Sequence, residues 1–360
     1  MTNKNFCVIM AGGVGARFWP LSKSHEPKQF LDIMGTGRSF IRATFERFLP
    51  LVPVENFLVV TSSAYKDLVF EHIPELKEDQ VLLEPLRRNT APCIAYATYK
   101  IACKCPDASM VVTPADHLVL DSQEFTRVVE NGLNFVEGSE KLLTIGIKPT
   151  RPETGYGYIQ HRNSDTNEIN SVKTFTEKPC LEMAEAFLKS GDFLWNSGIF
   201  LWTVPAIKRA FEKYLPQIAA NFERGLSLYN TPEEQVFIDE LYPECENISI
   251  DYGIMEKAQD VYVADGDFGW SDIGTWGSIY QNSTHKDENQ NILQGGEVLT
   301  YNTRGSVVVV PKGKVAVVEG LEDYLVVDKD DVLLITKLSN EQNIRNYVDD
   351  VKYRFGKKYV

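Results

Sequence analysis

The chain has 360 residues, of which 43% are hydrophobic and 24% are charged, so it can bury a large core in one big domain or two, and this composition excludes a disordered protein. Its formal net charge of -13 leaves no basic face for nucleic acid, and an anionic membrane surface would repel it. Any phosphate chemistry must therefore rely on cations gathered locally.

Strands and helices alternate over roughly the first 205 residues. Four short apolar runs bounded by turn residues are typical of buried strands: residues 6–11, 57–61, 110–113 and 142–147. Residues 39–49 place their apolar side chains on one helical face, and residues 90–103 form an alanine-rich helical stretch that tolerates Pro92 in its first turn. This alternation predicts an α/β fold with a mostly parallel sheet covered by helices on both faces.

A glycine-rich loop follows the first strand directly. It reads Ala11, Gly12, Gly13, Val14, Gly15, Ala16 and Arg17. Glycine lets backbone N–H groups approach phosphate oxygens closely, but a Walker loop would need Gly-Lys-Ser/Thr and the dinucleotide fingerprint would need glycine at Phe18. Arg17 and Lys28 add two cations to the same stretch and favour phosphate binding. The alternatives are a tight strand-to-helix turn and a solvated Lys28.

Two aspartates lie in settings that suit a metal ion. Asp116 follows the third predicted strand, at the sheet edge where open α/β folds bind ligands. Asp272 lies far downstream among glycine and tryptophan residues. Together they could hold Mg²⁺, which prefers oxygen ligands and completes its shell with water and substrate phosphates. A helix cap or a turn is the alternative role for Asp116. His117 is expected to be a supporting or structural histidine, because no partner imidazole or triad spacing accompanies it.

The character of the sequence changes after residue 280. Residues 281–291 form a long polar run with no apolar period, which predicts a linker. Beyond it, short valine-rich strands at even spacing predict a small β appendage of solenoid-like coils, at residues 306–310, 315–318, 324–327 and 332–335. Residues 340–353 show a helical phase. We therefore expect a catalytic domain over residues 1–285 and a β-rich domain with a terminal helix over residues 286–360.

The cysteine content and the amino terminus favour a cytoplasmic protein. No apolar stretch approaches the roughly 20 residues that cross a bilayer, and the amino terminus has no signal-peptide core. No cysteine pair has zinc or redox spacing, so reduced structural thiols are expected. The six cysteines are Cys7, Cys93, Cys103, Cys105, Cys180 and Cys245.

Nine ordered segments together resemble the nucleoside-diphosphate-sugar pyrophosphorylases, and within them the mannose-1-phosphate guanylyltransferases. The segments are residues 11–22, 27–30, 84–92, 113–117, 153–159, 175–179, 195–200, 249–256 and 269–276. Each is weak alone, because glycine turns and surface bends are common, but their order along most of the chain is specific. The resemblance implies a Rossmann-like nucleotidyltransferase sheet with a short β-helix-like domain at its carboxyl end, and one activity instead of two.

The resemblance also implies roles for individual residues. Phosphate contacts and catalysis fall to Arg17, Lys28, Asp116, Lys178 and Asp272, with Asp116 and Asp272 as the ligands of Mg²⁺. The substrate-binding set is Ala11, Gly12, Gly13, Gly15, Arg17, Glu84, Asn89, Thr90, Asp116, Gly157, Glu177, Lys178 and Asn196. Glu84, Asn89 and Thr90 border the nucleoside, while Gly157, Glu177, Lys178 and Asn196 line the sugar-phosphate side. The roles of Asp251 and Glu256 stay open.

The implied reaction transfers GMP from GTP to mannose 1-phosphate, giving GDP-mannose and pyrophosphate by in-line attack at the α-phosphorus. The attacking phosphate is already an anion, so alignment and charge neutralisation suffice and no catalytic histidine is needed. Three alternatives stay open: a pyrophosphorylase for another base or sugar, a glycosyltransferase, and a non-catalytic subunit that binds nucleotide sugar. The oligomeric state also stays open, with a homodimer as one option.

Overall fold

The computed structural model describes residues 4–13, 15–162 and 168–360, so Val14 of the glycine loop lies outside the described residues. The chain forms two compact units, each assembled from several segments. The first unit comprises residues 1–12, 44–115 and 119–270. The second comprises residues 13–43, 116–118 and 271–360. The glycine loop therefore begins in the first unit and continues in the second.

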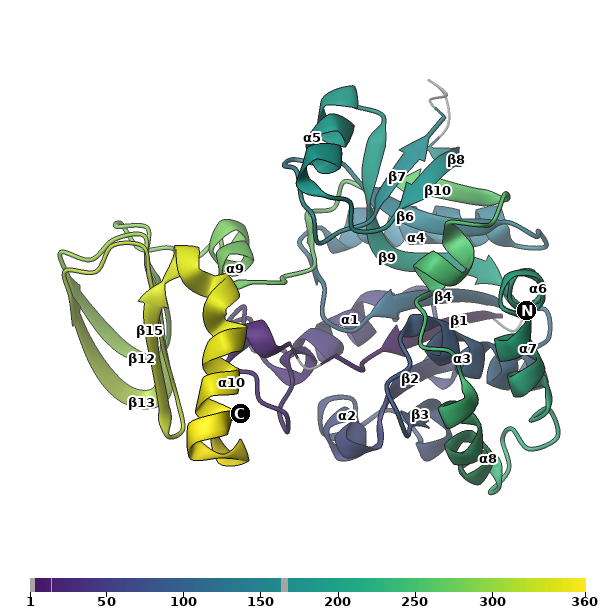
Figure 1. Ribbon diagram of the computed structural model, residues 1–360, viewed down its shortest axis with the longest axis horizontal. Coiled ribbons are helices and arrows are strands. Elements are labelled where there is room, and N and C mark those ends of the chain that lie inside the picture. The colour runs from purple at the N-terminus through teal and green to yellow at the C-terminus, as the bar shows by residue number, and fades with distance from the viewer. Residues whose placement is uncertain (1–3, 14, 163–167) are drawn as a thin grey trace. The chain divides into compact units, whose positions relative to one another are not determined.

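The first unit is built on a nine-stranded sheet, shown in Figure 1. Its strands are β1 (Asn5–Met10), β2 (Phe57–Ser62), β3 (Val81–Glu84), β4 (Ser109–Pro114), β6 (Leu142–Ile147), β7 (Tyr158–His161), β8 (Ile169–Thr176), β9 (Phe193–Thr203) and β10 (Val261–Asp265). The order across the sheet is β3-β2-β1-β4-β9-β6-β10-β8-β7. Only β8 and β9 among these strands run against β1. The expected mixed, mostly parallel sheet is confirmed.

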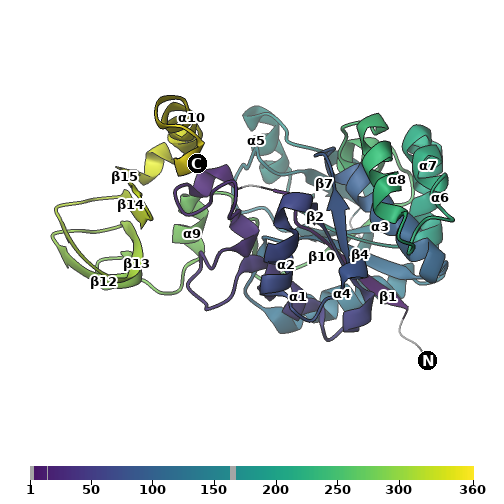
Figure 2. The ribbon, with the colours of Figure 1, turned by 90° about the horizontal axis from the view of Figure 1, so that it is seen from below.

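Helices of the first unit cover this sheet. They are α2 (Lys66–His72), α3 (Thr90–Lys104), α4 (Ser122–Val136), α5 (Leu181–Ser190), α6 (Val204–Tyr214), α7 (Pro216–Glu223) and α8 (Glu234–Leu241), with α1 (Phe40–Phe48) at the junction of two segments. α3, α6 and α7 pack against one another, as Figure 2 shows. Every residue of α3 from 91 to 101 is buried, because its small and aromatic side chains fill the space between the sheet and these neighbours. None of the described helices combines the length and apolarity needed to cross a membrane.

The second unit contains a four-stranded sheet that coils. Its strands are β12 (Ile292–Tyr301), β13 (Val307–Glu319), β14 (Tyr324–Lys329) and β15 (Val332–Lys337). Ile292 pairs with Val307 and Val307 pairs with Leu325, both in parallel, so successive coils advance by 15 and 18 residues. Parallel neighbours joined without a helix require a chain that winds round on itself, which agrees with the expected β-helix-like appendage. One detail of the sequence prediction is wrong: the two strands predicted at residues 306–310 and 315–318 form the single long strand β13, which begins at Val307.

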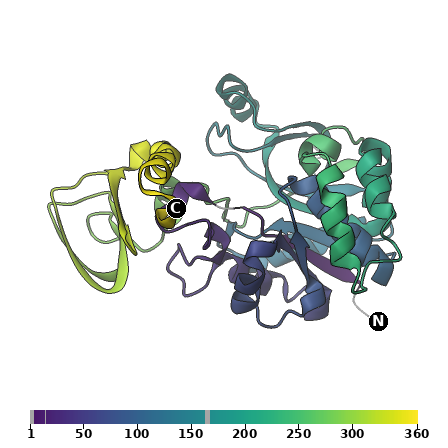
Figure 3. The same cartoon turned by 60° about the horizontal axis from the view of Figure 1, so that its bottom comes forward.

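Two helices complete the second unit, α9 (Trp276–Asn282) and α10 (Ile344–Phe355). α10, drawn in yellow, packs against the short 3₁₀ turn at residues 16–18 (Figure 3). The Trp19 indole donates a hydrogen bond of 2.7 Å to the carbonyl of Tyr359. The polar run at residues 281–291 ends α9 and then forms a tight turn, in which the Asp287 carboxylate accepts hydrogen bonds from Asn289 and Asn291. The domain boundary at residue 285 stays a prediction, since compactness groups residues 271–360 together. Outside both sheets, β5 (Leu118–Val119) pairs with β11 (Trp270–Ser271).

Candidate active site

The glycine loop leads into a turn that depends on one glycine. Gly15 has a φ of 68° and precedes the 3₁₀ turn Ala16–Phe18, which carries Arg17. A Cβ on Gly15 would lie 2.4 Å from the Cβ of Lys28, closer than two carbons can approach. Both the backbone conformation and the contact therefore require glycine here. The Arg17 guanidinium donates to the carbonyl of Gly274 at 3.5 Å.

Lys28 is a buried cation among the predicted site residues of the second unit. The residue is 4% exposed, and its ammonium lies 5.6 Å from the ring centre of Phe18 and 5.1 Å from that of Phe40. Lys28 Nζ forms an ion pair of 2.9 Å with Asp116 and donates a hydrogen bond of 2.7 Å to the backbone carbonyl of Asp272. The structure thus brings together three residues that are distant in the sequence. The surface role considered for Lys28 is wrong.

Charge and backbone geometry fix the two aspartates in place. Burial raises the pKa of Asp116, but the Lys28 ammonium, His117 and hydrogen bonds outweigh burial, and the pKa lies below its ordinary value. Asp272 accepts a hydrogen bond of 3.0 Å from the backbone N–H of Gly274. Ile273, which lies between Asp272 and Gly274, has a φ of 43° although it is β-branched and fully buried. This strained backbone conformation costs on the order of 1–3 kcal/mol. Core packing around Ile273 holds the backbone that presents Asp272.

A divalent cation fits this donor set. Two carboxylates lie on segments that meet at one ammonium group, and carboxylate oxygens are the ligands that Mg²⁺ prefers. The described residues contain no group of three or more histidine, cysteine, aspartate or glutamate side chains that could enclose a metal. That arrangement is compatible with Mg²⁺, which typically binds one or two carboxylates and takes its other ligands from water and substrate phosphates.

The expected nucleoside side lies in the first unit, at the carboxyl end of β3. Glu84 is 9% exposed, and a Cβ on Gly12 would lie 3.6 Å from its Oε2 atom. Asn89 has a φ of 66° and accepts a hydrogen bond from the N–H of Thr90, so it caps α3. The Thr90 hydroxyl in turn accepts the N–H of Ile250 at 2.9 Å. Glu84 therefore borders the first glycine of the loop, while Asn89 and Thr90 organise the start of α3.

The expected sugar-phosphate side is also in the first unit, where Gly157 separates two polar side chains. A Cβ on Gly157 would lie 2.4 Å from Glu177 Oε2 and 3.2 Å from the Cβ of Asn196. The Asn196 amide is oriented on both sides, since its oxygen accepts from the hydroxyl of Thr144 at 3.1 Å and its nitrogen donates to Asp251 at 2.9 Å. Glycine at position 157 thus allows the Glu177 carboxylate and the Asn196 amide, which has a fixed orientation, to pack directly against the backbone.

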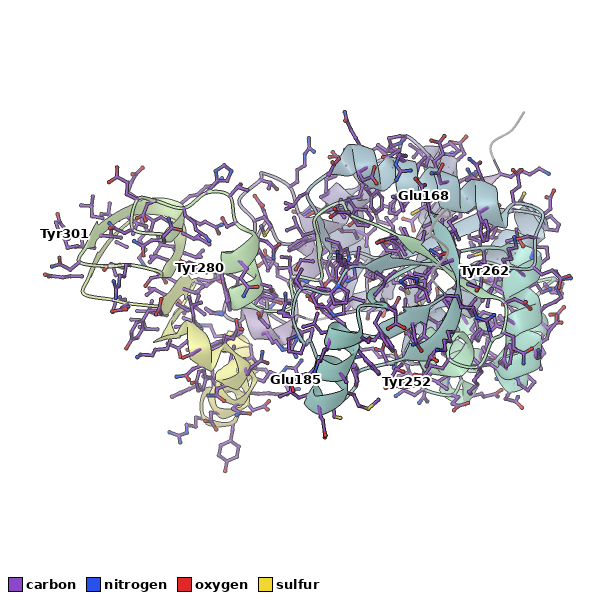
Figure 4. All side chains as sticks on the ribbon, turned by 90° about the horizontal axis from the view of Figure 1, so that it is seen from above. Glu168, Glu185, Tyr252, Tyr262, Tyr280 and Tyr301 are labelled. Atoms are coloured by element: carbon purple, nitrogen blue, oxygen red, sulfur yellow. The ribbon has the colours of Figure 1, made fainter. Side chains whose placement is uncertain are left out.

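Lys178 occupies a strained turn directly after Glu177. Its φ is 47°, its ammonium pairs with Glu177 at 2.7 Å, and the N–H of Glu177 is bound by the carboxylate of Glu256 at 3.0 Å. Burial raises the pKa of Asp251 to about 7, assisted by the charge of Glu177. Tyr252, labelled in Figure 4, is 44% exposed on the π-helical turn that begins at Asp251. Asp251 and Glu256, whose roles the sequence left open, both hold groups of this cluster in place.

Comparison with known proteins identifies the family of the chain. The family model described as nucleotidyl transferase matches residues 6–289. The chain belongs to this nucleotidyl transferase family. It is 35% identical over 352 residues to the mannose-1-phosphate guanylyltransferase of Escherichia coli, and the match covers 95% of this chain and 74% of that protein.

Solved structures agree with the family assignment. A structure from Thermus thermophilus, described as a mannose-1-phosphate geranyltransferase, superposes with a TM-score of 0.87 at 31% identity, covering 97% of this chain and 99% of that one. A structure from Helicobacter pylori, described as a mannose-6-phosphate isomerase, gives a TM-score of 0.59 at 27% identity over 74% of this chain and 99% of that one. The first of these covers both units of the present nucleotidyl transferase almost completely.

Sequence reasoning missed several residues that support the site of this nucleotidyl transferase. Tyr242 is fully buried, and its hydroxyl donates a hydrogen bond of 2.9 Å to Glu84. Gln29 donates to the carbonyl of Gly13, and the hydroxyl of Thr61 donates to that of Ala11. Gln29 lies beside Lys28 in a quoted motif, which could have marked it, but nothing in the sequence around Tyr242 links it to Glu84.

Proposed function

We propose that this nucleotidyl transferase transfers GMP from GTP to mannose 1-phosphate, releasing pyrophosphate and forming GDP-mannose. The observation that carries the proposal is the Lys28 ammonium, which is held by the Asp116 carboxylate and the Asp272 carbonyl beside the glycine-containing turn of Arg17. This arrangement concentrates cationic donors in a chain of net charge -13. The Escherichia coli mannose-1-phosphate guanylyltransferase shares about a third of the sequence, and the Thermus thermophilus structure shares the fold.

The attacking group is a phosphate oxygen of the sugar phosphate, which is an anion before the reaction begins. It displaces pyrophosphate from the α-phosphorus in line, so no proton has to be removed from the nucleophile. Arg17 and Lys28 neutralise charge on the triphosphate, and Lys178 neutralises charge on the sugar phosphate. Fixed cations that need no reorganisation stabilise the charge spread over the transition state.

Asp116 and Asp272 are the residues that would hold Mg²⁺, which would supply additional neutralisation of the phosphate oxygens when bound. Asp116 stays ionised because Lys28 lowers its pKa despite burial. On the sugar side, the absence of a side chain at Gly157 lets Glu177 and Asn196 pack close together, and these two side chains orient the hydroxyl groups of the sugar.

We place the reaction in the cytoplasm, where the six free cysteines of the chain stay reduced. A homodimer is the simplest assembly to test by light scattering, since most soluble oligomers are symmetric homo-oligomers.

The decisive experiment measures pyrophosphate release with GTP, UTP, dTTP and ATP against a panel of sugar 1-phosphates. We expect release with GTP and mannose 1-phosphate, loss of release on chelation, and recovery with added Mg²⁺. Release with another pair only would make the chain a pyrophosphorylase of different specificity. Consumption of GDP-mannose without pyrophosphate would indicate a glycosyltransferase, and no turnover with any pair would indicate a binding subunit.

A further inference from the structure

The two carboxylate oxygens of Glu84 have different surroundings. Oε1 accepts the hydroxyl hydrogen of Tyr242 at 2.9 Å, whereas Oε2 is the atom that faces Gly12 at the start of the glycine loop. Tyr242 itself is fully buried and lies in the 3₁₀ turn Tyr242–Glu244 that follows α8. One oxygen is therefore committed to the protein, and the other points to the sheet edge where open α/β folds bind their ligands.

The ionisation state of such a carboxyl group decides which nucleobase it can pair with. A carboxylate only accepts hydrogen bonds, so it suits the N1–H and N2–H₂ donors of guanine. A neutral carboxylic acid protonated on Oε2 offers an O–H donor there instead, which suits the N1 acceptor of adenine. A site that reads guanine must therefore keep Glu84 ionised, although burial opposes the charge.

Three titratable or charged groups face Glu84 from the elements packed around it. Tyr242 donates from the turn after α8, Arg87 contributes its charge from the loop after β3, and the thiol of Cys93 faces it from α3. Burial raises the pKa of Glu84 to about 7, while the Tyr242 hydrogen bond and the Arg87 charge oppose that rise. Tyr242 is thus the direct hydrogen-bonding partner that favours the acceptor-only form.

We propose that Tyr242 is a specificity-determining positioning residue, which favours the acceptor-only carboxylate form of Glu84 with Oε2 turned toward the nucleobase and thereby favours guanine over adenine. The inference rests on the proposed function, because it takes the ligand beside Gly12 to be the nucleoside of the triphosphate. Tyr242 acts through Glu84 and makes no contact with substrate in this scheme.

The test compares wild type with Tyr242→Phe, using Tyr229→Phe as the matched control. Tyr229 is also a buried tyrosine, but its hydroxyl donates to the backbone carbonyl of Phe222 at 2.9 Å. Pyrophosphate release is measured for GTP and for ATP with mannose 1-phosphate and Mg²⁺ between pH 5.5 and 9. We expect Tyr242→Phe to lower the GTP-to-ATP ratio of kcat/KM about tenfold near pH 7, the loss of one hydrogen bond to a charged group. We also expect the acid limb of the GTP profile to move up by about one pH unit.

A second variant, Glu84→Gln, keeps the inference testable if Tyr242→Phe fails to fold. Its amide oxygen accepts from Tyr242, so its NH₂ group faces the nucleotide as a donor at every pH. We expect Glu84→Gln to favour ATP over GTP relative to wild type at all pH values above 6. A wild-type GTP-to-ATP ratio and pH profile in either folded variant would overturn the inference.

The outcome for the proposed function is separate. A wild-type enzyme that uses UTP or dTTP in place of GTP would overturn the proposed function and the preference for guanine. It would not overturn the role of Tyr242 in keeping Glu84 ionised, because the N3–H donor of those bases also requires an ionised Glu84. The pH shift in Tyr242→Phe would then be measured with that nucleotide. Wild-type turnover of GTP with unchanged behaviour of both variants would leave the proposed function standing and overturn the inference alone.

Discussion

Replacing Lys28 with methionine tests the centre of the proposed site most directly. Methionine keeps an unbranched chain against the aromatic rings but removes the ammonium that binds Asp116 at 2.9 Å and the carbonyl of Asp272 at 2.7 Å. Removing one preorganised charge-stabilising donor typically costs roughly 3–4 kcal/mol in the transition state, or on the order of 10²–10³ in rate. We expect Lys28→Met to lower kcat/KM for GTP by that factor, measured as pyrophosphate release with saturating mannose 1-phosphate.

Lys23 provides a control for the structural part of this effect. It is 5% exposed, close to the 4% of Lys28, and it forms an ion pair of 2.7 Å with Asp330 in the same unit. Lys23→Met therefore removes an equally buried ammonium without touching the proposed site. The reasoning is refuted if Lys28→Met retains kcat/KM within about threefold of Lys23→Met while both remain folded.

The same substitution has a consequence for stability that depends on pH. Because Lys28 holds the folded-state pKa of Asp116 below its ordinary value, the pair stabilises the wild type above the unfolded pKa, and that stability is lost as the pH falls through the folded pKa. Lys28→Met should already lack this contribution at neutral pH. Urea unfolding from pH 3 to 7 should therefore show a smaller acid-side loss in the variant. Because a third of the Asp116 side chain is exposed, solvent screens the ion pair. We therefore expect the difference between wild type and variant in the free energy of unfolding to be about 1–2 kcal/mol.

Three further substitutions test other parts of the structure. Gly157→Ala places a methyl group 2.4 Å from Glu177 and should raise the KM for mannose 1-phosphate roughly tenfold or more, measured by initial rates. Asp251→Asn should flatten the pH dependence of unfolding between about pH 4 and 7, because a folded-state pKa of about 7 makes the wild type lose stability as the pH rises through that window. Lys100→Met leaves the buried Glu234 carboxylate without its ammonium partner and should reduce the free energy of unfolding by about 3–5 kcal/mol, with kcat/KM unchanged.

Each of these outcomes has a clear contrary result. Gly155→Ala is the control for position 157, since the nearest atom to a Cβ there is a flexible carboxylate oxygen at 3.3 Å, and equal KM values in the two variants would count against the sugar-side assignment. Parallel pH–stability curves for wild type and Asp251→Asn would show that Asp251 titrates normally. A loss of less than about 1 kcal/mol in Lys100→Met would show that Tyr96 and the Asn230 N–H alone satisfy Glu234.

The fold was predictable wherever the pattern is local. Apolar runs bounded by turns gave β1, β2, β4 and β6 to within a residue or two, because a strand buried on both faces reads as a continuous apolar segment. The position of β9 between β4 and β6 was not predictable, since that register depends on pairings between residues roughly 50–90 positions apart. The grouping of residues 13–43 with the carboxyl-terminal part is likewise a property of packing and leaves no mark on composition.

The site was predictable as a set of residue types but not as a set of contacts. Glycine motifs and isolated charges pointed to Arg17, Lys28, Asp116 and Asp272, yet the sequence could not show that Lys28 joins the last two. Tyr242 was out of reach for the same reason: it lies 158 positions from Glu84, and an isolated tyrosine in an apolar helix end usually serves only the core.

Strained backbone conformations occur among the proposed site residues of both units. Asn89 and Lys178 in the first unit and Ile273 in the second all have positive φ without being glycine, at costs on the order of 1–3 kcal/mol each. In each case a neighbour holds the strained residue: the Asn89 side chain bonds the N–H of Thr90, the Lys178 N–H bonds the carbonyl of Tyr156, and Ile273 is buried in the core. Local contacts offset this strain in each case. A protein is expected to retain such strain where the position of a ligand-binding side chain matters more than the stability of the fold. Replacing Lys178 with glycine relieves the backbone strain at this position and should therefore leave the unfolding free energy nearly unchanged. It should still lower kcat/KM, because the ammonium is lost. Arginine at the same position keeps the charge and should recover part of the activity.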